Sequence, residues 1–244
     1  MEGKKLTNYI LIGVFAVAVV ALGFWIFTYD KPEATEIIPE VAGPDISGTR
    51  FVSERSDIWW DAKYSVNKES SELVWTGYKV GGSHTGNVDI KEGIIYEKDG
   101  VFAGGSFKID MDTISVNDIE DQESNRNLLK QLKSTEFFNV EQYPEATFEI
   151  ERVLKEKDVN MYSTVGKFTI KGVEREIGLF THIAKEGDKY IVESDFAIDR
   201  TLWNIRYGSS KFFDDLGDNF IDDTIEFKLK MVLDKEVENQ QTNN

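Results

Sequence analysis

Cysteine is absent from the 244 residues, and histidine occurs only twice, as His84 and His182. The lack of cysteine excludes a disulfide framework, a thiol nucleophile and a cysteine-ligated metal site. The two histidines lie far apart and form neither a His-x-x-x-His nor a Glu-x-x-His arrangement, so no zinc site is predicted. Ser83 precedes His84, but adjacency in sequence defines no catalytic geometry, and no nucleophile elbow is present. The sequence therefore predicts a protein that is not an enzyme and needs no cofactor.

Positive charge is also scarce, because 28 Lys and Arg residues stand against 44 Asp and Glu residues, a formal net charge of −16. Such acidity argues against binding to nucleic acid or to an anionic lipid surface. Five acidic residues cluster around Gly217 but lack the ligand spacing and the final bidentate Glu of a calcium loop. We expect them to form a solvated acidic rim: Asp214, Asp215, Asp218, Asp222 and Asp223.

The run Tyr9–Tyr29 contains 21 residues without a charge. At a rise of about 1.5 Å per residue, a helix of this length spans roughly the 30 Å of a bilayer's hydrocarbon core. Lys4 and Lys5 precede the run, which favours a cytoplasmic N-terminus. A cleaved signal peptide is the alternative, but the run ends in the bulky residues FWIF rather than in a small-residue cleavage site. We expect residues 1–30 to be a single-pass anchor in the cell membrane, with the following domain extracytoplasmic (periplasmic).

Proline is rare, and three of the four prolines fall between residues 31 and 61, interleaved with glutamates. A segment of this composition stays extended and does not fold alone. We therefore expect an acidic linker at residues 31–61. Trp60, late in the linker, either packs back on the following domain or lies against the membrane. Residues 235–244 are expected to form a disordered tail.

From residue 62 onward the sequence shows the alternation of antiparallel strands with one dry and one wet face. Phe148 and Ile150 alternate with polar residues, and Phe168 and Ile170 do the same. About eight strands and one short helical crossover predict an all-β fold, an eight-stranded antiparallel lipocalin-like barrel over residues 62–234. The helix is expected to be capped at Ser124-Asn125 and to carry an apolar stripe of Leu128, Leu129 and Leu132.

Three short stretches have a packing interpretation, and for the first and the third of them a ligand interpretation is the alternative. Paired glycines at 104–105 inside a strand favour a bulge or bend over close approach of a ligand. Phe137 and Phe138, followed by a Tyr-Pro entry into a strand at 143–144, indicate a plug across one barrel mouth. Asp199 and Arg200 are interpreted either as a structural ion pair or as part of a head-group site.

Seven pieces in order resemble the YceI-like family of lipocalin-like, polyisoprenoid-binding proteins over about residues 62–234. They are WTGYKVGGSHTG at 75–86, GGSFKIDM at 104–111, LKSTEFF at 132–138, YPEATF at 143–148, FTIKG at 168–172, FAIDRT at 196–201 and YGSSKFF at 207–213. The resemblance implies an exported barrel that encloses an apolar pocket for an isoprenoid chain, such as a quinone tail or a polyprenyl phosphate. Gln131 departs from the family pattern, since many relatives carry His there, and a retained anchor departs from the usual cleavable leader.

The inward aromatic and aliphatic residues are predicted to line this pocket. His84, Arg200 and Arg206 are candidates for its head-group end, and the acidity of the chain favours a neutral, quinone-like head. Trp75 and Tyr78 point to opposite faces of a strand, so at most one of them is expected to line the pocket. The full set of predicted ligand-binding residues is Trp75, Tyr78, His84, Phe107, Phe148, Ile150, Phe168, Ile170, Phe196, Ile198, Arg200, Trp203, Arg206, Phe227 and Leu229.

Two functions are compatible with these patterns. The first is a membrane-tethered binding protein that holds an isoprenoid lipid for transport, storage or sequestration, with a homodimer as one possible assembly. The alternative is a solid-cored structural module without a ligand, which docks a partner in the cell envelope.

Overall fold

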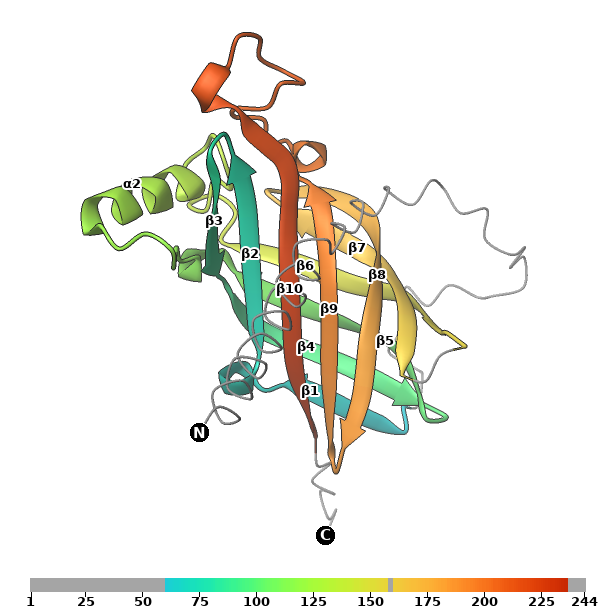
Figure 1. Cartoon of the computed structure of the whole chain (residues 1–244). Helices are drawn as coiled ribbons and strands as arrows, with labels where there is room; N and C mark the ends of the chain where they lie inside the picture. Colours follow the sequence, from blue (N-terminus) through green and yellow to red (C-terminus); the bar gives the residue numbers. More distant parts are fainter. Residues whose placement is uncertain (1–59, 158–159, 237–244) are drawn as a thin grey trace, which may run out of the picture. The chain divides into compact units, whose positions relative to one another are not determined.

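The computed structural model describes residues 60–157 and 160–236, and within these ranges the chain forms ten strands and one α-helix (Figure 1). The helix α2 spans Gln122–Lys133, between β5 and β6. The strands are β1 (Ala62–Val66), β2 (Glu72–Lys79), β3 (Gly82–Asn87), β4 (Asp89–Lys98), β5 (Val101–Asp110), β6 (Glu145–Lys155), β7 (Met161–Ile170), β8 (Val173–Glu186), β9 (Lys189–Asp199) and β10 (Ile221–Lys235).

The strands form one antiparallel sheet that closes on itself through a pairing of β1 with β10. Strands β1 and β2 both pair with β10 and are separated by a short 3₁₀ helix, η1 (Lys68–Ser70). Strands β3 and β4 follow each other with Val88 between them and pair with β2 and β1, respectively. Counted as β1/β2, β3/β4 and β5 to β10, the closed sheet has eight strands. The predicted eight-stranded antiparallel barrel with one helical crossover is therefore confirmed, and closure leaves no long exposed edge.

A bulge lies beside the paired glycines of β5, as predicted. Tyr96 pairs with Gly104 and the next residue, Glu97, pairs with Phe102, so Ala103 is an extra residue in the ladder. At Gly105 a Cβ atom would lie 2.3 Å from the carbonyl oxygen of Ile94, closer than any real contact. The glycine pair thus serves strand packing, which confirms the structural interpretation.

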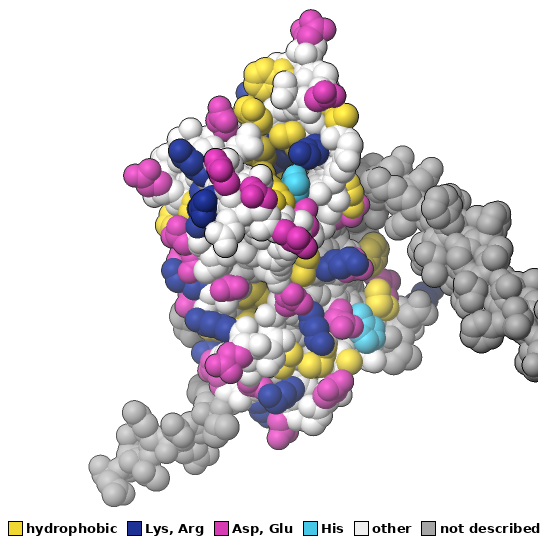
Figure 2. Space-filling view, turned by 60° about the vertical axis from the view of Figure 1, so that its left-hand side comes forward, with side chains coloured by type: hydrophobic (Ala, Val, Ile, Leu, Met, Phe, Trp, Pro, Cys, Tyr) yellow, Lys and Arg dark blue, Asp and Glu magenta, His cyan; other side chains and the backbone are white. Residues whose placement is uncertain are grey.

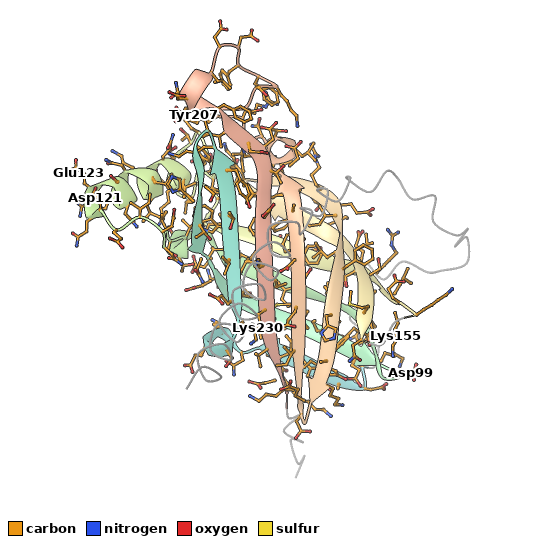
Figure 3. The ribbon with its side chains drawn as sticks, viewed as in Figure 1. Asp99, Asp121, Glu123, Lys155, Tyr207 and Lys230 are labelled. Atoms are coloured by element: carbon orange, nitrogen blue, oxygen red, sulfur yellow. The ribbon has the colours of Figure 1, made fainter. Side chains whose placement is uncertain are left out.

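Helix α2 begins one turn earlier than its predicted cap. The side chain of Asp121 accepts the hydrogen bond of the Ser124 amide at 2.8 Å, so Asp121, and not Ser124-Asn125, is the cap. Asn125 instead donates to the carbonyls of Val116 and Ile119 and ties the helix to the preceding loop. The predicted apolar stripe is confirmed, because Leu132 is buried and Leu128 and Leu129 pack against the core. Asp121 and Glu123 lie at the far end of α2 from the barrel (Figure 3).

Aromatic residues fill the end of the barrel near Asp99 and Lys155, opposite the end near Tyr207 (Figure 3). The hydroxyl groups of Tyr64 and Tyr190 donate to the same Glu97 oxygen, at 2.9 and 3.1 Å. The ring of Phe102 meets the Tyr190 ring edge-on, with centroids 4.7 Å apart. This end is therefore closed by packed rings and a shared carboxylate.

The ends of the predicted domain need small corrections. Trp60 stacks on Tyr96 with ring centroids 4.9 Å apart, so the last part of the predicted linker packs on the barrel. Lys235 still belongs to β10, and the amide of Glu236 donates to the carbonyl of Lys63, so the predicted tail begins inside the ordered sheet. The predicted anchor at residues 1–30, the linker up to residue 59 and residues 237–244 lie outside the described residues. In the described part, no helix has the length and apolarity to cross a membrane.

Candidate functional site

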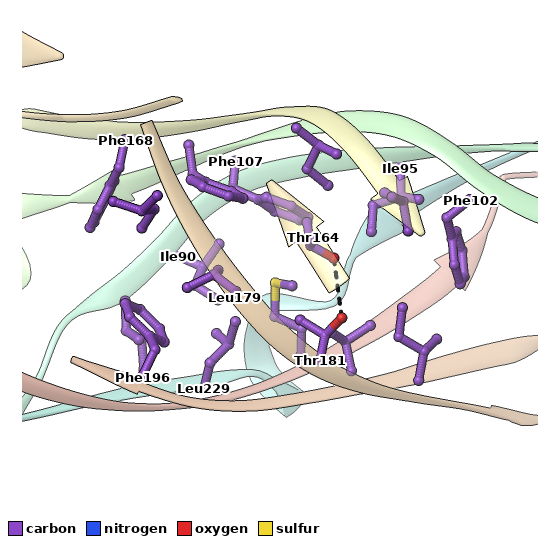
Figure 4. A pocket seen from close by; sticks show the side chains of 18 of the residues that line it. Ile90, Ile95, Phe102, Phe107, Thr164, Phe168, Leu179, Thr181, Phe196 and Leu229 are labelled. Carbon is purple, nitrogen blue, oxygen red and sulfur yellow. Dashed lines mark hydrogen bonds between the residues drawn. The ribbon is translucent and has the colours of Figure 1, made fainter. Parts of the chain in front are cut away.

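A first pocket of about 70 Å³ lies inside the barrel between inward side chains of eight strands, β2 and β4 to β10 (Figure 4). Its lining is aliphatic and aromatic apart from two hydroxyl groups, those of Thr164 on β7 and Thr181 on β8. The two hydroxyl oxygens lie 3.2 Å apart. The other lining residues are Leu73, Ile90, Ile95, Phe102, Phe107, Ile109, Phe148, Ile150, Val153, Phe168, Ile177, Leu179, Ile183, Val192, Phe196, Leu229 and Met231.

A second pocket of about 170 Å³ lies between the barrel and the segment that carries α2. Phe137 and Phe138 are buried and line it beside Leu128 and Leu132 of the helix, so they cover this part of the interior as the predicted plug would. Its polar lining residues are Tyr78, Lys79, His84, Gln131, Arg200 and Asp222. This pocket is therefore the more polar of the two.

Leu73, Ile109 and Phe168 line both pockets and form the wall between them. The Phe168 ring meets the rings of Phe148 and Trp203 edge-on, at centroid distances of 6.1 and 5.9 Å. An apolar cavity of about 150 Å³ holds one benzene ring in a protein interior. The second pocket accordingly has room for one ring-sized group, whereas a longer chain has to occupy both pockets and displace side chains of this wall.

Most of the predicted ligand-binding residues line one of these pockets. Those at the first pocket are Phe107, Phe148, Ile150, Phe168, Phe196 and Leu229. Those at the second pocket are Trp75, Tyr78, His84, Phe168, Ile170, Arg200 and Phe227. Ile198, Trp203 and Arg206 line neither pocket: Ile198 and Trp203 are buried elsewhere in the core, and Arg206 is exposed.

Trp75 and Tyr78 both line the second pocket, although alternation along the strand predicted that at most one would. Trp75 is buried, and its indole nitrogen donates to the carbonyl of Ser115 at 3.2 Å. Tyr78 lies near the end of β2, where its hydroxyl donates to Glu226 at 2.6 Å. This hydrogen bond raises the pKa of Tyr78 to about 12. The β2–β10 ladder is irregular between Ile221 and Ile225, opposite this end of β2, so strict alternation does not hold there.

Arg200, a predicted head-group residue, is held by the protein's own backbone. Its exposed fraction is 1%, and its guanidinium group donates to the carbonyls of Ile205, Ile221 and Asp222 at 2.8 to 3.0 Å. Burial lowers the pKa of the guanidinium group, and the nearby carboxylate of Asp223, at 3.5 Å, opposes that shift. Arg200 thus joins η3 (Arg200–Trp203) to the start of β10.

The structural ion pair at this place differs from the predicted one. Asp199 accepts from Lys211 at 2.5 Å, not from the adjacent Arg200, and Lys211 also reaches Asp223 at 3.2 Å. Asp223 therefore does not belong to a purely solvated rim as predicted, whereas Asp214, Asp215 and Asp218 are exposed.

The other two head-group candidates also have partners within the chain. The Nδ1 atom of His84 lies 2.9 Å from a carboxylate oxygen of Asp118, whose second oxygen accepts from the Thr85 amide. The guanidinium group of Arg206 lies over the Phe212 ring, 4.5 Å from its centroid. The Nδ1 atom of His84 and the guanidinium group of Arg206 are therefore already in contact with groups of the chain itself.

Several lining residues were missed by sequence reasoning. Thr164, Gly166, Phe168 and Ile170 are the buried residues of β7, so the alternation extends further back than its apolar residues show. Thr181 follows Leu179 by two residues and precedes Ile183 by two on β8. Extending each alternation through polar and glycine positions would have found both threonines.

The described surface carries acidic and basic side chains side by side with small hydrophobic areas (Figure 2). In residues 60–157 and 160–236, no group of three or more His, Asp or Glu residues is arranged to hold a metal ion. The geometry is thus that of an apolar interior with few polar groups, which suits the binding of an apolar ligand.

Comparison with known proteins agrees with this geometry. The profile of the YceI-like domain matches residues 64–233. A UPF0312 protein of Pectobacterium atrosepticum is 34% identical over 76 residues, which cover 31% of this chain and only 38% of that relative's length. Two solved structures share the fold. Burkholderia cenocepacia BcnA has a TM-score of 0.54 and 20% identity, and the match covers 68% of this chain and 98% of that one. A polyisoprenoid binding domain from Saccharophagus degradans has a TM-score of 0.53 and 14% identity, and the match covers 71% of this chain and 98% of that one. The protein belongs to the family of the YceI-like domain.

Proposed function

We propose that this protein binds an isoprenoid lipid, with the apolar chain held in the two pockets inside the barrel. The observation that carries the proposal is the wall of Leu73, Ile109 and Phe168, which makes the two pockets neighbours within one apolar interior. Burial of each CH₂ group stabilises a complex by roughly 0.8 kcal/mol, so a chain of several isoprene units needs little polar help. The fold of the polyisoprenoid binding domain from Saccharophagus degradans supports the proposal.

The proposal includes a neutral ligand. The first pocket has no charged lining residue, and burial of an unpaired charge costs far more than its contacts return. Arg200, the most buried cation of the second pocket, already donates to three carbonyls. A quinone or polyprenol therefore fits better than a pyrophosphate.

The proposal also includes a membrane tether and an extracytoplasmic barrel. Its support is the uncharged run at residues 9–29, preceded by Lys4 and Lys5. A barrel tethered in this way stays within reach of the bilayer that supplies its ligand. Protease protection of tags at residues 1–8 and at the C-terminus, measured in intact cells, tests the orientation. The homodimer stays a prediction, which a measurement of the mass of the assembly would test.

Extraction of lipid from the full-length protein tests the binding function. The wild type, Phe168→Asp and Phe180→Asp are purified in the same non-ionic detergent from the natural host, and bound lipid is identified by mass spectrometry. Phe180 is the matched control because it is 51% exposed on β8 and lines neither pocket. We expect a stoichiometric isoprenoid with the wild type and Phe180→Asp, and its loss from Phe168→Asp.

A folded variant is needed for that comparison. If near-UV circular dichroism shows that Phe168→Asp is unfolded, Leu179→Trp replaces it, because a larger apolar side chain fills the first pocket without burying a charge. Retention of the same lipid by a folded pocket variant contradicts the proposed site. An empty wild type that takes up neither quinone nor polyprenol favours the alternative, a structural module that docks a partner.

A further inference from the structure

The first pocket contains two hydroxyl groups where apolar side chains of the same shape would fit. Thr164 and Thr181 are each 5% exposed, and both face a lining that is otherwise aliphatic and aromatic (Figure 4). Valine has nearly the same shape as threonine, with a methyl group in place of the hydroxyl, so nothing in the packing requires a hydroxyl. A hydroxyl buried in apolar surroundings is costly unless it is hydrogen-bonded. The pair therefore calls for an account of its hydrogen bonds.

The hydrogen bonds of the pair have a direction. Thr181 Oγ1 lies 3.3 Å from the carbonyl oxygen of Tyr162, which accepts only, so Thr181 donates its hydrogen there. Thr164 Oγ1, 3.2 Å away, then donates to Thr181 Oγ1. Both hydroxyl hydrogens are thereby used. Thr164 Oγ1 is left with acceptor capacity, and in the described part of the chain no donor other than Thr181 lies within bonding distance of it.

An acceptor inside a neutral apolar pocket selects for a neutral donor. No Lys, Arg, Asp or Glu side chain lines the first pocket, so a charged ligand group has no partner there. A hydroxyl group is a neutral donor of suitable size, whereas an ether or a ketone offers only a second acceptor.

The three residues that were predicted to hold a polar head group already have partners within the chain. Arg200 donates to three carbonyls, His84 is bonded to Asp118, and Arg206 lies over Phe212. Each group predicted to hold a head is thus engaged within the chain. Lys79 and Gln131 are further polar residues of the second pocket, and Thr164 differs from them in being a neutral acceptor with an exposed fraction of only 5%.

We propose that Thr164 Oγ1 accepts a hydrogen bond from the hydroxyl of the bound lipid, whose hydroxyl end lies in the first pocket and whose chain extends past Phe168 into the second. This inference rests on the proposed function and names its ligand class, an apolar lipid alcohol. Thr181 positions Thr164 by accepting its hydrogen.

A pair of short ligands tests the inference. Geraniol and geranyl methyl ether share one carbon chain and one oxygen, but only the alcohol donates a hydrogen bond. Their binding to the full chain in phosphatidylcholine nanodiscs is measured by titration calorimetry, with empty nanodiscs subtracted. We expect the wild type to bind the alcohol about 3- to 10-fold more tightly than the ether, the value of one neutral hydrogen bond.

Variants separate this bond from general packing. Thr164→Val is expected to reduce the ratio of alcohol to ether affinity to about 1, and Thr164→Ser to restore it. Thr169→Val is the matched control, since Thr169 lies on the same strand, is not buried and lines neither pocket. Thr181→Val removes the acceptor of the Thr164 hydroxyl, which can then donate to an ether oxygen. The affinity of this variant for the ether should therefore rise several-fold relative to the wild type.

The outcomes are distinguishable. A wild-type ratio near 1, or a ratio that survives in folded Thr164→Val, overturns the hydroxyl site but leaves lipid binding in place. Failure of the wild type to bind either ligand contradicts the proposed function and the hydroxyl site with it. If Thr164→Val does not fold, Thr181→Val and Thr164→Ser decide, and an unchanged ether affinity in Thr181→Val overturns the inference.

Discussion

The indole nitrogen of Trp203 donates a hydrogen bond of 2.9 Å to the backbone carbonyl of Phe168. The side chain of Phe168 lines both pockets, and its ring meets the Trp203 ring edge-on. Trp203 itself lines neither pocket and has an exposed fraction of 1%. Trp203 therefore supports the predicted site without contacting the pockets, because it fixes the backbone and the ring of Phe168 on β7.

Trp203→Phe tests this support. The change leaves the Phe168 carbonyl without its partner and leaves a small gap in the core, so we expect the free energy of unfolding to fall by about 2 to 3 kcal/mol. Urea unfolding followed by circular dichroism measures it. Trp60→Phe is the control, because Trp60 stacks on Tyr96 at the surface, and we expect a loss below about 1 kcal/mol. Equal losses in the two variants would contradict a special role for Trp203.

Arg200→Met and Arg206→Met form a second matched pair. Arg200 is buried and donates to three carbonyls, so its removal takes this donor from the three oxygens and leaves Asp223 with Lys211 as its remaining cation among the described residues. We expect a loss of about 3 to 5 kcal/mol in the free energy of unfolding for Arg200→Met. Arg206 is exposed over Phe212, and its replacement should cost less than about 1 kcal/mol. Chemical denaturation of both variants under one condition decides, and a mild effect at Arg200 would refute its structural role.

The amino-acid pattern reveals the strands better than the contacts between them. Alternation at Phe148, Ile150, Phe168 and Ile170 predicts an inward face, because a strand that covers an apolar interior repeats every two residues. The visible alternation on β7 ends at Gly166, because glycine has no apolar side chain, although Thr164 lies on the same buried face. The predicted set therefore contains six of the apolar lining residues of the first pocket and neither of its hydroxyl groups.

Long-range partners explain the remaining differences. The role of Arg200 depends on carbonyls of Ile221 and Asp222, about twenty residues away, which no local pattern indicates. The wall between the pockets joins Leu73, Ile109 and Phe168 from three separate strands. Asp121 and Ser124 are both good helix caps, so composition alone leaves the start of α2 ambiguous by a turn. These features are decided by tertiary packing.

Gly105→Ala tests the close approach of β4 and β5. A methyl group at Gly105 would lie 2.3 Å from the Ile94 carbonyl oxygen, so the backbone has to shift. We expect a loss of about 2 to 3 kcal/mol in the free energy of unfolding. At Gly82, in the β2–β3 hairpin, an added Cβ meets no atom within 4 Å, so Gly82→Ala should stay within about 0.5 kcal/mol of the wild type. Thermal unfolding of the pair checks both values, and a neutral Gly105→Ala would contradict the described register.

The tyrosines that share Glu97 predict a loss of stability at alkaline pH. Burial and the hydrogen bond to Glu97 raise the pKa of Tyr190 to about 12 and raise the pKa of Tyr64 further still. A phenol whose pKa is higher in the folded state than in the unfolded state, where it is about 10, stabilises the fold fully below pH 10. That contribution is lost as pH rises from about 10 through about 12, because the unfolded chain releases its proton first.

Tyr190→Phe isolates this contribution. Because Tyr190 is only partly buried, solvent screening limits the effect, and we expect the variant to lose about 1 kcal/mol less than the wild type between pH 9 and pH 12. Tyr96→Phe, a ring that stacks on Trp60 and is not bonded to Glu97, should follow the wild-type curve. Urea unfolding across this pH range measures the slopes. If Tyr190→Phe and the wild type lose stability in parallel, the shared carboxylate does not retain the tyrosine proton, and packing of the rings alone closes this end of the barrel.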